Sequence, residues 1–266
     1  MTALRTDLSG RTALITGSTS GIGEALAEGL AAQGANIVIN GLGDRRKIDE
    51  KTTKIADIHG VEARYHGADM TRPDEIAEMV AFARSEFGRL DILVNNAGVQ
   101  HVEAIETFPE NKWDAIMAIN LSSVFHATKA AIPLMKARGR GRIVNIASAH
   151  GLVASPFKSA YVTAKHGVLG FTKTAALEVA QDGITVNAIC PGYVKTPLVD
   201  NQIADTAKVR GITEDEVVRD VMLAAQPTKK FVTYEELVGA LSYLVSDAGA
   251  STNGAALTVD GGWTAQ

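Results

Sequence analysis

A serine, a tyrosine and a lysine in the second half of the chain have the types and spacing that proton transfer needs: Ser148, Tyr161 and Lys165. Residues four apart on a helix share one face, so the phenol and the ammonium would lie one turn apart. A free tyrosine has a pKa of about 10 and is a poor base at neutral pH. A fixed positive charge favours the phenolate, and the pair could then exchange a proton with an oxygen that Ser148 holds. Alone the Tyr-x-x-x-Lys pair is weak evidence, because average composition often supplies it.

A glycine-rich turn near the start of the chain indicates phosphate binding. The segment Thr16 to Gly23 connects an apolar run to a helical pattern and contains Gly17 and Gly21 as well. Glycine permits positive φ and close approach of a phosphate, and a helix N-terminus offers free N–H groups. The spacing differs from the usual Gly-x-Gly-x-x-Gly fingerprint, and a tight turn alone would need one such glycine. We therefore favour dinucleotide binding over a purely structural turn.

Short β-branched runs alternate with longer helical patterns along nearly the whole chain. We predict strands at 12–16, 36–40, 62–66, 90–95, 142–147, 184–189 and 256–259, and helices that include 110–137 and 158–180. Near-continuous apolar strands separated by helices of crossover length favour a parallel sheet covered on both faces. No linker divides the chain. We predict one doubly wound α/β domain of the Rossmann type over residues 1–266.

One segment departs from this alternation. Residues 193–226 are charged, helix-prone and without a strand, and they follow the sixth strand. They should therefore lie at the carboxyl edge of the sheet, where ligands bind in open α/β folds. We interpret the segment as a substrate-binding lid rather than a plain surface insertion.

Composition narrows the class of protein. The net charge of −4 gives no reason to expect nucleic acid or an anionic membrane as a partner. Cys190 is the single cysteine, which excludes a disulfide within the chain and fits a reducing compartment. The N-terminus has no apolar signal core, and no His-Glu-x-x-His pattern occurs. We expect a cytoplasmic protein with no metal site.

Six motifs together, in order and spacing, resemble the short-chain dehydrogenase/reductase family over essentially the whole chain. They are Thr16-Gly17-x-x-x-Gly21-Ile22-Gly23, Asn95-Asn96-Ala97-Gly98, Asn120, Ser148, Tyr161-x-x-x-Lys165 and Pro191-Gly192. The resemblance implies a seven-stranded parallel sheet in the order 3-2-1-4-5-6-7 and hydride transfer between a nicotinamide and a substrate carbon. It also implies that the catalytic residues are Asn120, Ser148, Tyr161 and Lys165.

The same resemblance implies a cofactor site along the carboxyl edge. Asp69 would bond the adenine amino group, Lys165 the nicotinamide ribose, and Asn120 would hold a water that relays protons to Lys165. The implied cofactor-binding set is Gly17, Thr19, Ser20, Gly21, Ile22, Gly23, Asp69, Asn96, Ala97, Gly98, Tyr161, Lys165, Pro191, Gly192, Val194 and Thr196.

The choice between NAD and NADP depends on the end of the second strand. Asn40-Gly41-Leu42-Gly43 offers neither the acidic residue of many NAD sites nor a basic one, while Arg45 and Arg46 follow slightly later. These residues leave both cofactors open.

Two further side chains should converge on the pocket of Tyr161. His150 lies two residues beyond Ser148 on extended backbone, and Lys158 lies three before Tyr161. Donor and cationic groups at that place suit a small carboxylate substrate. The alternative is that Lys158 is solvated and His150 merely packs.

Three longer stretches, 96–101, 146–155 and 259–264, resemble the branch of the family that oxidises (R)-3-hydroxybutyrate to acetoacetate. That resemblance implies NAD, a homotetramer, and a tryptophan, here Trp263, that closes the pocket from a neighbouring subunit or the chain's own tail. The implied substrate-binding set is Gln100, Ser148, His150, Lys158, Tyr161, Gln202 and Trp263. Tyr193 departs from the pattern, where we expect tryptophan, and this change could alter tolerance for longer chains.

Two other functions compete with this interpretation. An NADPH-dependent 3-oxoacyl-carrier reductase would need a basic docking patch for its acidic carrier, but the lid carries Asp200, Asp205, Glu214, Asp215, Glu216 and Asp220. A non-catalytic dinucleotide sensor would typically lose the serine, tyrosine or lysine. The stretch 113–121 is apolar on more than one helix face, which suits either subunit contact or deep burial.

Overall fold

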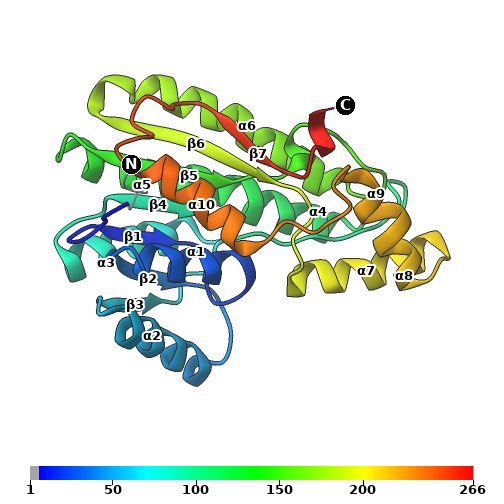
Figure 1. Ribbon diagram of the computed structural model, residues 1–266, viewed down its shortest axis with the longest axis horizontal. Coiled ribbons are helices and arrows are strands. Elements are labelled where there is room, and N and C mark those ends of the chain that lie inside the picture. The colour runs from blue at the N-terminus through cyan, green and yellow to red at the C-terminus, as the bar shows by residue number, and fades with distance from the viewer. Residues whose placement is uncertain (1–5, 266) are drawn as a thin grey trace.

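The computed structural model describes residues 6–265 and is built on one parallel sheet of seven strands in the order β3-β2-β1-β4-β5-β6-β7 (Figure 1). The strands are β1 (Thr12–Ile15), β2 (Asn36–Asn40), β3 (Ala63–His66), β4 (Ile92–Asn95), β5 (Gly141–Ile146), β6 (Ile184–Pro191) and β7 (Ala256–Val259). The predicted fold class and strand order are confirmed. The order reverses between β1 and β4, and ligands bind beside such a switch point at the carboxyl ends of the strands.

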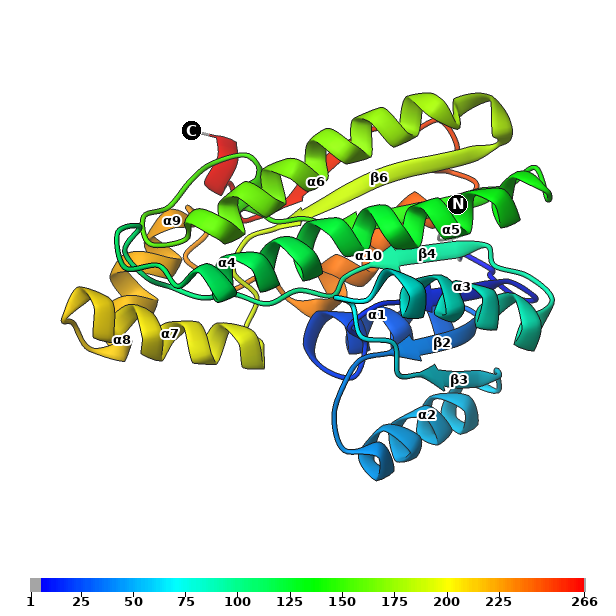
Figure 2. The same cartoon turned by 180° about the vertical axis from the view of Figure 1, so that it is seen from behind.

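Helices cover both faces of the sheet. One face carries α1 (Gly21–Ala31), α2 (Arg45–His59) and α10 (Tyr234–Val245), seen in front in Figure 1. The other carries α3 (Pro73–Phe87), α4 (Glu110–Met117), α5 (Ser123–Lys136) and α6 (Ser159–Glu178), seen in front in Figure 2. Helix α10 begins with the predicted capping box, in which Thr233 and Glu236 each bond the other's backbone N–H.

The two layers of helices explain why the strands are apolar without alternation. Successive side chains of a strand point to opposite faces, and here both faces are covered. In β1, Ile15 packs into the core beneath α1 and α10, whereas Leu14 packs into the core beneath α3 and α5. In β4, Val94 packs into the same core as Ile15, and Leu93 packs into the same core as Leu14. All four of these side chains are fully buried.

The predicted helix at 110–137 is one continuous helical stretch, but a π-helical turn at Ala118–Ser122 separates α4 from α5. Such turns hold one extra residue and often mark functional sites. Asn120 lies in this turn and is buried. By length and composition alone, the stretch Glu110–Lys136 is the one helix among the described residues that could cross a membrane. Its α5 part packs against α3 and the sheet.

The segment 193–226 is helical. It contains α7 (Pro197–Arg210), α8 (Glu214–Glu216), a π-helical turn (Val217–Met222) and α9 (Leu223–Ala225). These elements lie beyond the carboxyl ends of the strands in Figure 1. They have a small core of their own, in which Tyr193, Val199 and Val217 are buried and Trp263 packs against them.

The burial of Leu93 gives a test of this two-layer core. Leu93→Ala should lower the free energy of unfolding by about 2–5 kcal/mol, because it leaves a cavity in a fully buried site. The control Ile58→Ala removes an apolar side chain that is 61% exposed on α2 and should change stability by less than about 0.5 kcal/mol. Urea denaturation measures both, and similar losses in the two variants would contradict the proposed core.

Candidate active site

The glycine turn between β1 and α1 leaves its backbone open to a ligand. Gly17 and Gly21 have φ of +62° and +59°. A Cβ on Gly17 would lie 2.8 Å from the Cα of Ala97, and one on Gly23 would collide with the Gly17 carbonyl. Ser20 precedes α1 without capping it by its side chain, so the first N–H groups of the helix keep their capacity to bind an anion. This cradle fits the pyrophosphate of a dinucleotide.

The end of β4 holds the glycine turn in place. Thr16 Oγ1 accepts hydrogen bonds from the backbone N–H groups of Asn96 and Ala97, at 2.9 and 3.0 Å. Asn96 Nδ2 donates to the carbonyls of Thr16 and Gly17, at 2.9 and 3.0 Å. Asn95 Nδ2 donates to Asn145 Oδ1 at 2.8 Å and joins β4 to β5. The two asparagines therefore fix the end of β4 to the end of β1 and to β5, on either side of it.

The end of β2 forms the wall beside the turn. Asn40 is fully buried; its Oδ1 accepts from Gly17 N–H at 3.2 Å, and its Nδ2 donates to the carbonyls of His66 and Ala68. Arg45 is held elsewhere, because its Nε lies 2.8 Å from Asp49 and its guanidinium lies over the ring of Tyr65. The predicted adenine ligand, Asp69, lines the cleft, with Oδ1 accepting from the Thr71 N–H and hydroxyl.

Ser148, Tyr161 and Lys165 come together at the floor of the cleft. Burial raises the pKa of Tyr161 to about 12, and a hydrogen bond with Ser148 opposes that shift. Lys165 Nζ lies 5.6 Å from the centroid of the Tyr161 ring and donates to the Ile146 carbonyl at 2.7 Å. Burial lowers the pKa of Lys165 to about 8. The helix α6 thus places a half-buried phenol and a buried amine one turn apart, as the spacing predicts.

The side chain of Asn120 bonds the backbone of a neighbouring loop. Its Oδ1 accepts from the Val99 N–H and its Nδ2 donates to the Val99 carbonyl, both at 2.9 Å. The side chain therefore fixes the loop after β4 and is not among the residues that line the cleft. Its role in a water relay to Lys165 stays a prediction.

A second group of polar side chains lies beside the catalytic set. His150 is 3% exposed, and its Nε2 lies 2.9 Å from Ser155 Oγ. Burial, followed by the nearby charge of Lys158, lowers the pKa of His150 to about 3, so the imidazole is neutral. Gln100 Nε2 is buried in the cleft wall without a partner among the described residues. Because a buried donor without a partner is costly, this amide is suited to an incoming acceptor.

Lys158 and Trp263 reach this end of the cleft by different routes. Lys158 is 5% exposed, and its Nζ donates to the hydroxyl of Tyr193 at 2.9 Å. Tyr193 lines the cleft, whereas Lys158 lies behind it. Trp263 of the chain's own tail stacks on Tyr193, with ring centroids 5.2 Å apart, and meets His150 edge-on at 4.8 Å.

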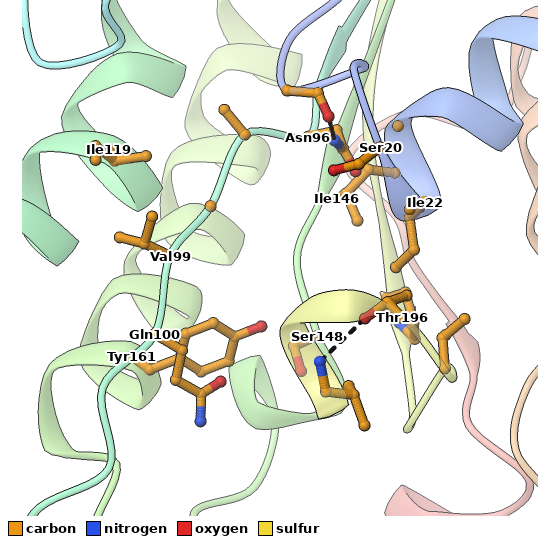
Figure 3. Close-up of a pocket in the computed structure, with 18 of the residues that line it drawn as sticks. Ser20, Ile22, Asn96, Val99, Gln100, Ile119, Ile146, Ser148, Tyr161 and Thr196 are labelled. Carbon is orange, nitrogen blue, oxygen red and sulfur yellow. Dashed lines mark hydrogen bonds between the residues drawn. The ribbon is translucent and has the colours of Figure 1, made fainter. Parts of the chain in front are cut away.

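One cleft of about 340 Å³ joins these parts, a size typical of small-ligand sites. Figure 3 shows Ser20 and Asn96 at one end, and Gln100, Tyr161 and Ser148 at the other. All predicted cofactor-binding and substrate-binding residues line it except Lys158, and Asn120 does not. The lining residues that sequence reasoning missed are Ala68, Met70, Val99, Ile119, Ile146, Ala147 and Val199. Asn40, Gly41, Leu42 and Tyr193 also line the cleft; the sequence singles them out for cofactor choice and substrate tolerance without assigning them to the binding sets.

The fold and the site define a class of protein. The sequence pattern of the short chain dehydrogenase family matches residues 11–207, so the chain belongs to that family of oxidoreductases. Among its relatives, a D-beta-hydroxybutyrate dehydrogenase of Rhizobium meliloti strain 1021 is 59% identical over 96% of this chain and 99% of its own. One of Cupriavidus necator is 55% identical over 97% and 100% of the two chains. The crystal structure of a levodione reductase is similar at a TM-score of 0.89, with 30% identity over 97% and 99%.

The glycine turn makes a testable claim about cofactor binding. Gly17→Ala should weaken the binding of NADH at least about tenfold, because its Cβ would press on the backbone of Ala97 inside the cradle. Gly60→Ala is a matched control, since Gly60 has φ of +65° and a methyl group there would meet no atom within 4 Å. The Gly60→Ala variant should lose only roughly 1–2 kcal/mol of stability, from backbone strain, and should bind NADH with unchanged affinity. Fluorescence titration measures both affinities; equal values would remove the turn from the cofactor site.

Proposed function

We propose that the chain catalyses the reversible oxidation of (R)-3-hydroxybutyrate to acetoacetate with NAD. The observation that carries the proposal is a buried ammonium beside the catalytic set. Lys158 is nine-tenths buried or more, and no acidic side chain among the described residues lies within ion-pair distance of it. A buried charge requires a partner, and a substrate carboxylate would provide one. The names of the two dehydrogenase relatives support the same substrate.

The residues of the cleft can bind a hydroxy acid and transfer its hydroxyl proton. Gln100 and His150 would donate to the carboxylate, and Ser148 would donate to the substrate's reacting oxygen. When bound, the nicotinamide supplies or accepts the hydride. Tyr161 would take the hydroxyl proton during oxidation and return it during reduction, with Lys165 favouring the phenolate by its charge.

The wall beside β2 supports NAD over NADP. Arg45 forms a bidentate pair with Asp49, with Nε 2.8 and 2.9 Å from its two oxygens, and Arg46 lies 3.9 Å from Glu50. Neither arginine lines the cleft, where Gly41 and the uncharged Leu42 stand. A 2′-phosphate would therefore meet no cation from this wall without rearrangement of these pairs.

The wider proposal includes the lid, the assembly and the location of the protein. The helices of 193–226 would close over the substrate, because Gln202 and Val199 of α7 line the cleft. A homotetramer would cover apolar side chains that stand exposed on α4 and α5, with Trp113 37% and Phe125 45% exposed. The low cysteine count supports work in the cytoplasm.

A 3-oxoacyl-carrier reductase is the second candidate, since it would use the same fold and the same serine, tyrosine and lysine. The acidic lid argues against it, because Asp200, Asp205 and Asp220 are exposed there. Absorbance of the reduced cofactor, followed with NAD or NADP and a panel of 3-hydroxy acids, separates the candidates. A non-catalytic sensor would bind the cofactor and turn over none of them.

The phenol of Tyr161 is the most direct target. Tyr161→Phe should lower kcat for 3-hydroxybutyrate by about 10²- to 10⁴-fold, because it removes the group that moves the proton. The affinity for NADH, measured by fluorescence, should stay within about twofold, since the glycine cradle is untouched. Substantial turnover by this variant would contradict the assignment of Tyr161 as the proton-transferring residue.

The charge of Lys158 should appear in the pH dependence of substrate affinity. Burial, followed by the positive charge of Arg210, lowers the pKa of Lys158 to about 7. The protonated amine binds a carboxylate, so KM should rise as pH increases above about 7, by up to roughly tenfold per unit. Lys158→Met should have a high KM below that pH and no such rise. A KM that is flat with pH in the wild type would contradict the carboxylate site.

A further inference from the structure

Tyr193 stands between the buried ammonium and the cleft. It follows Pro191-Gly192 at the carboxyl end of β6 and is 6% exposed. Its hydroxyl accepts the hydrogen bond of Lys158 Nζ at 2.9 Å. No other hydrogen bond of that ammonium is found among the described residues. The phenol is thus the contact through which Lys158 meets the wall of the cleft.

The ring of Tyr193 has contacts of its own. Gln202 of α7 lines the same cleft and lowers the pKa of Tyr193, against the burial that raises it. The ring stacks on Trp263 with an interplanar angle of 13° and meets His150 edge-on at 6.2 Å. The ring therefore contacts His150 and Trp263, which come from separate parts of the chain and line the substrate end of the cleft.

A tyrosine can make these contacts and the residues of similar shape cannot. A phenolic hydroxyl carries an acceptor oxygen, so it can accept the hydrogen bond of an ammonium. An indole N–H only donates and would oppose Lys158, and a phenylalanine ring would stack on Trp263 but leave the ammonium without a partner.

We propose that Tyr193 is a positioning and specificity residue of the carboxylate subsite, whose hydroxyl holds Lys158 at the cleft wall. The inference rests on the proposed function, because it assigns the substrate's carboxylate to this end of the cleft.

The charges around Lys158 agree with this role. His150 beside it is neutral, and Tyr193 keeps its proton because burial raises its pKa. Arg210, at the end of α7, is the other cation that acts on Lys158, and its guanidinium lies over the ring of Phe157, 5.7 Å from the centroid. Neither tyrosine nor glutamine carries a negative charge, so the protonated form of Lys158 has no anionic partner among the described residues until a substrate enters.

The test removes the hydroxyl and keeps the ring. Tyr193→Phe should raise KM for 3-hydroxybutyrate about tenfold with kcat within about twofold, because a hydrogen bond to a charged group is lost. The pH at which KM begins to rise should fall by about one unit, since the ammonium loses its acceptor. Tyr243→Phe, which removes an exposed hydroxyl on α10, is the matched control and should change neither value.

A binding measurement separates this inference from the proposed function. In a Trp113→Phe background, the fluorescence of Trp263 reports binding of acetate to the complex with NADH, against sodium chloride of equal ionic strength. If the wild type turns over no 3-hydroxy acid, the proposed function fails, yet about tenfold weaker acetate binding by Tyr193→Phe would still support the positioning role. Equal acetate affinities, no acetate binding by the wild type, or an unchanged KM and pH profile would overturn it. A fall in kcat with a lowered Tm would also overturn it, because it would show a merely structural role.

Discussion

The junction between β1 and β4 is the constraint on which the rest of the molecule depends. At this point the strand order turns from one direction to the other, and the carboxyl ends of two parallel strands separate. Thr16 and Asn96 bridge the gap with four hydrogen bonds of 2.9 to 3.0 Å. They satisfy the polar groups that a strand end would otherwise expose, and they leave the glycine turn open toward the cleft. The cofactor cradle is therefore a product of sheet topology.

The chemistry at the other end of the cleft is governed by burial. Tyr161, Lys165, Lys158 and His150 all have pKa values displaced by loss of water, each toward its neutral form. In such surroundings the charge of a bound ligand interacts strongly with these groups, because little solvent screens it. A cationic cofactor ring near Tyr161 would favour the phenolate, and a carboxylate near Lys158 would favour the ammonium. The groups are thus arranged so that the ligands complete the electrostatics of the site.

Much of the fold and part of the site could be predicted from the sequence. Strands such as β1 and β4 are almost wholly apolar, and the glycine turn and the Tyr-x-x-x-Lys pair are local patterns, so short stretches contain the information. The π-helical turn at Asn120 could not be foreseen, because it depends on how α4 and α5 pack on the sheet. The position of Lys158 behind Tyr193 also depends on tertiary contacts, since the start of α6 meets the end of β6 there. The stacking of Trp263 on Tyr193 likewise depends on tertiary contacts.

The π-helical turn at Ala118–Ser122 reconciles two demands on one helix. Helix α5 must keep its apolar residues in register with α3 and the sheet, while Asn120 must face the loop after β4 and bond Val99. A regular α-helix fixes the rotation of every residue relative to the next, so it could meet one of these demands and not both. One surplus residue releases the two halves from a common rotation. A single-residue deletion within 118–122 would therefore leave a regular α-helix, in which the surplus residue that lets Asn120 face the loop is lost.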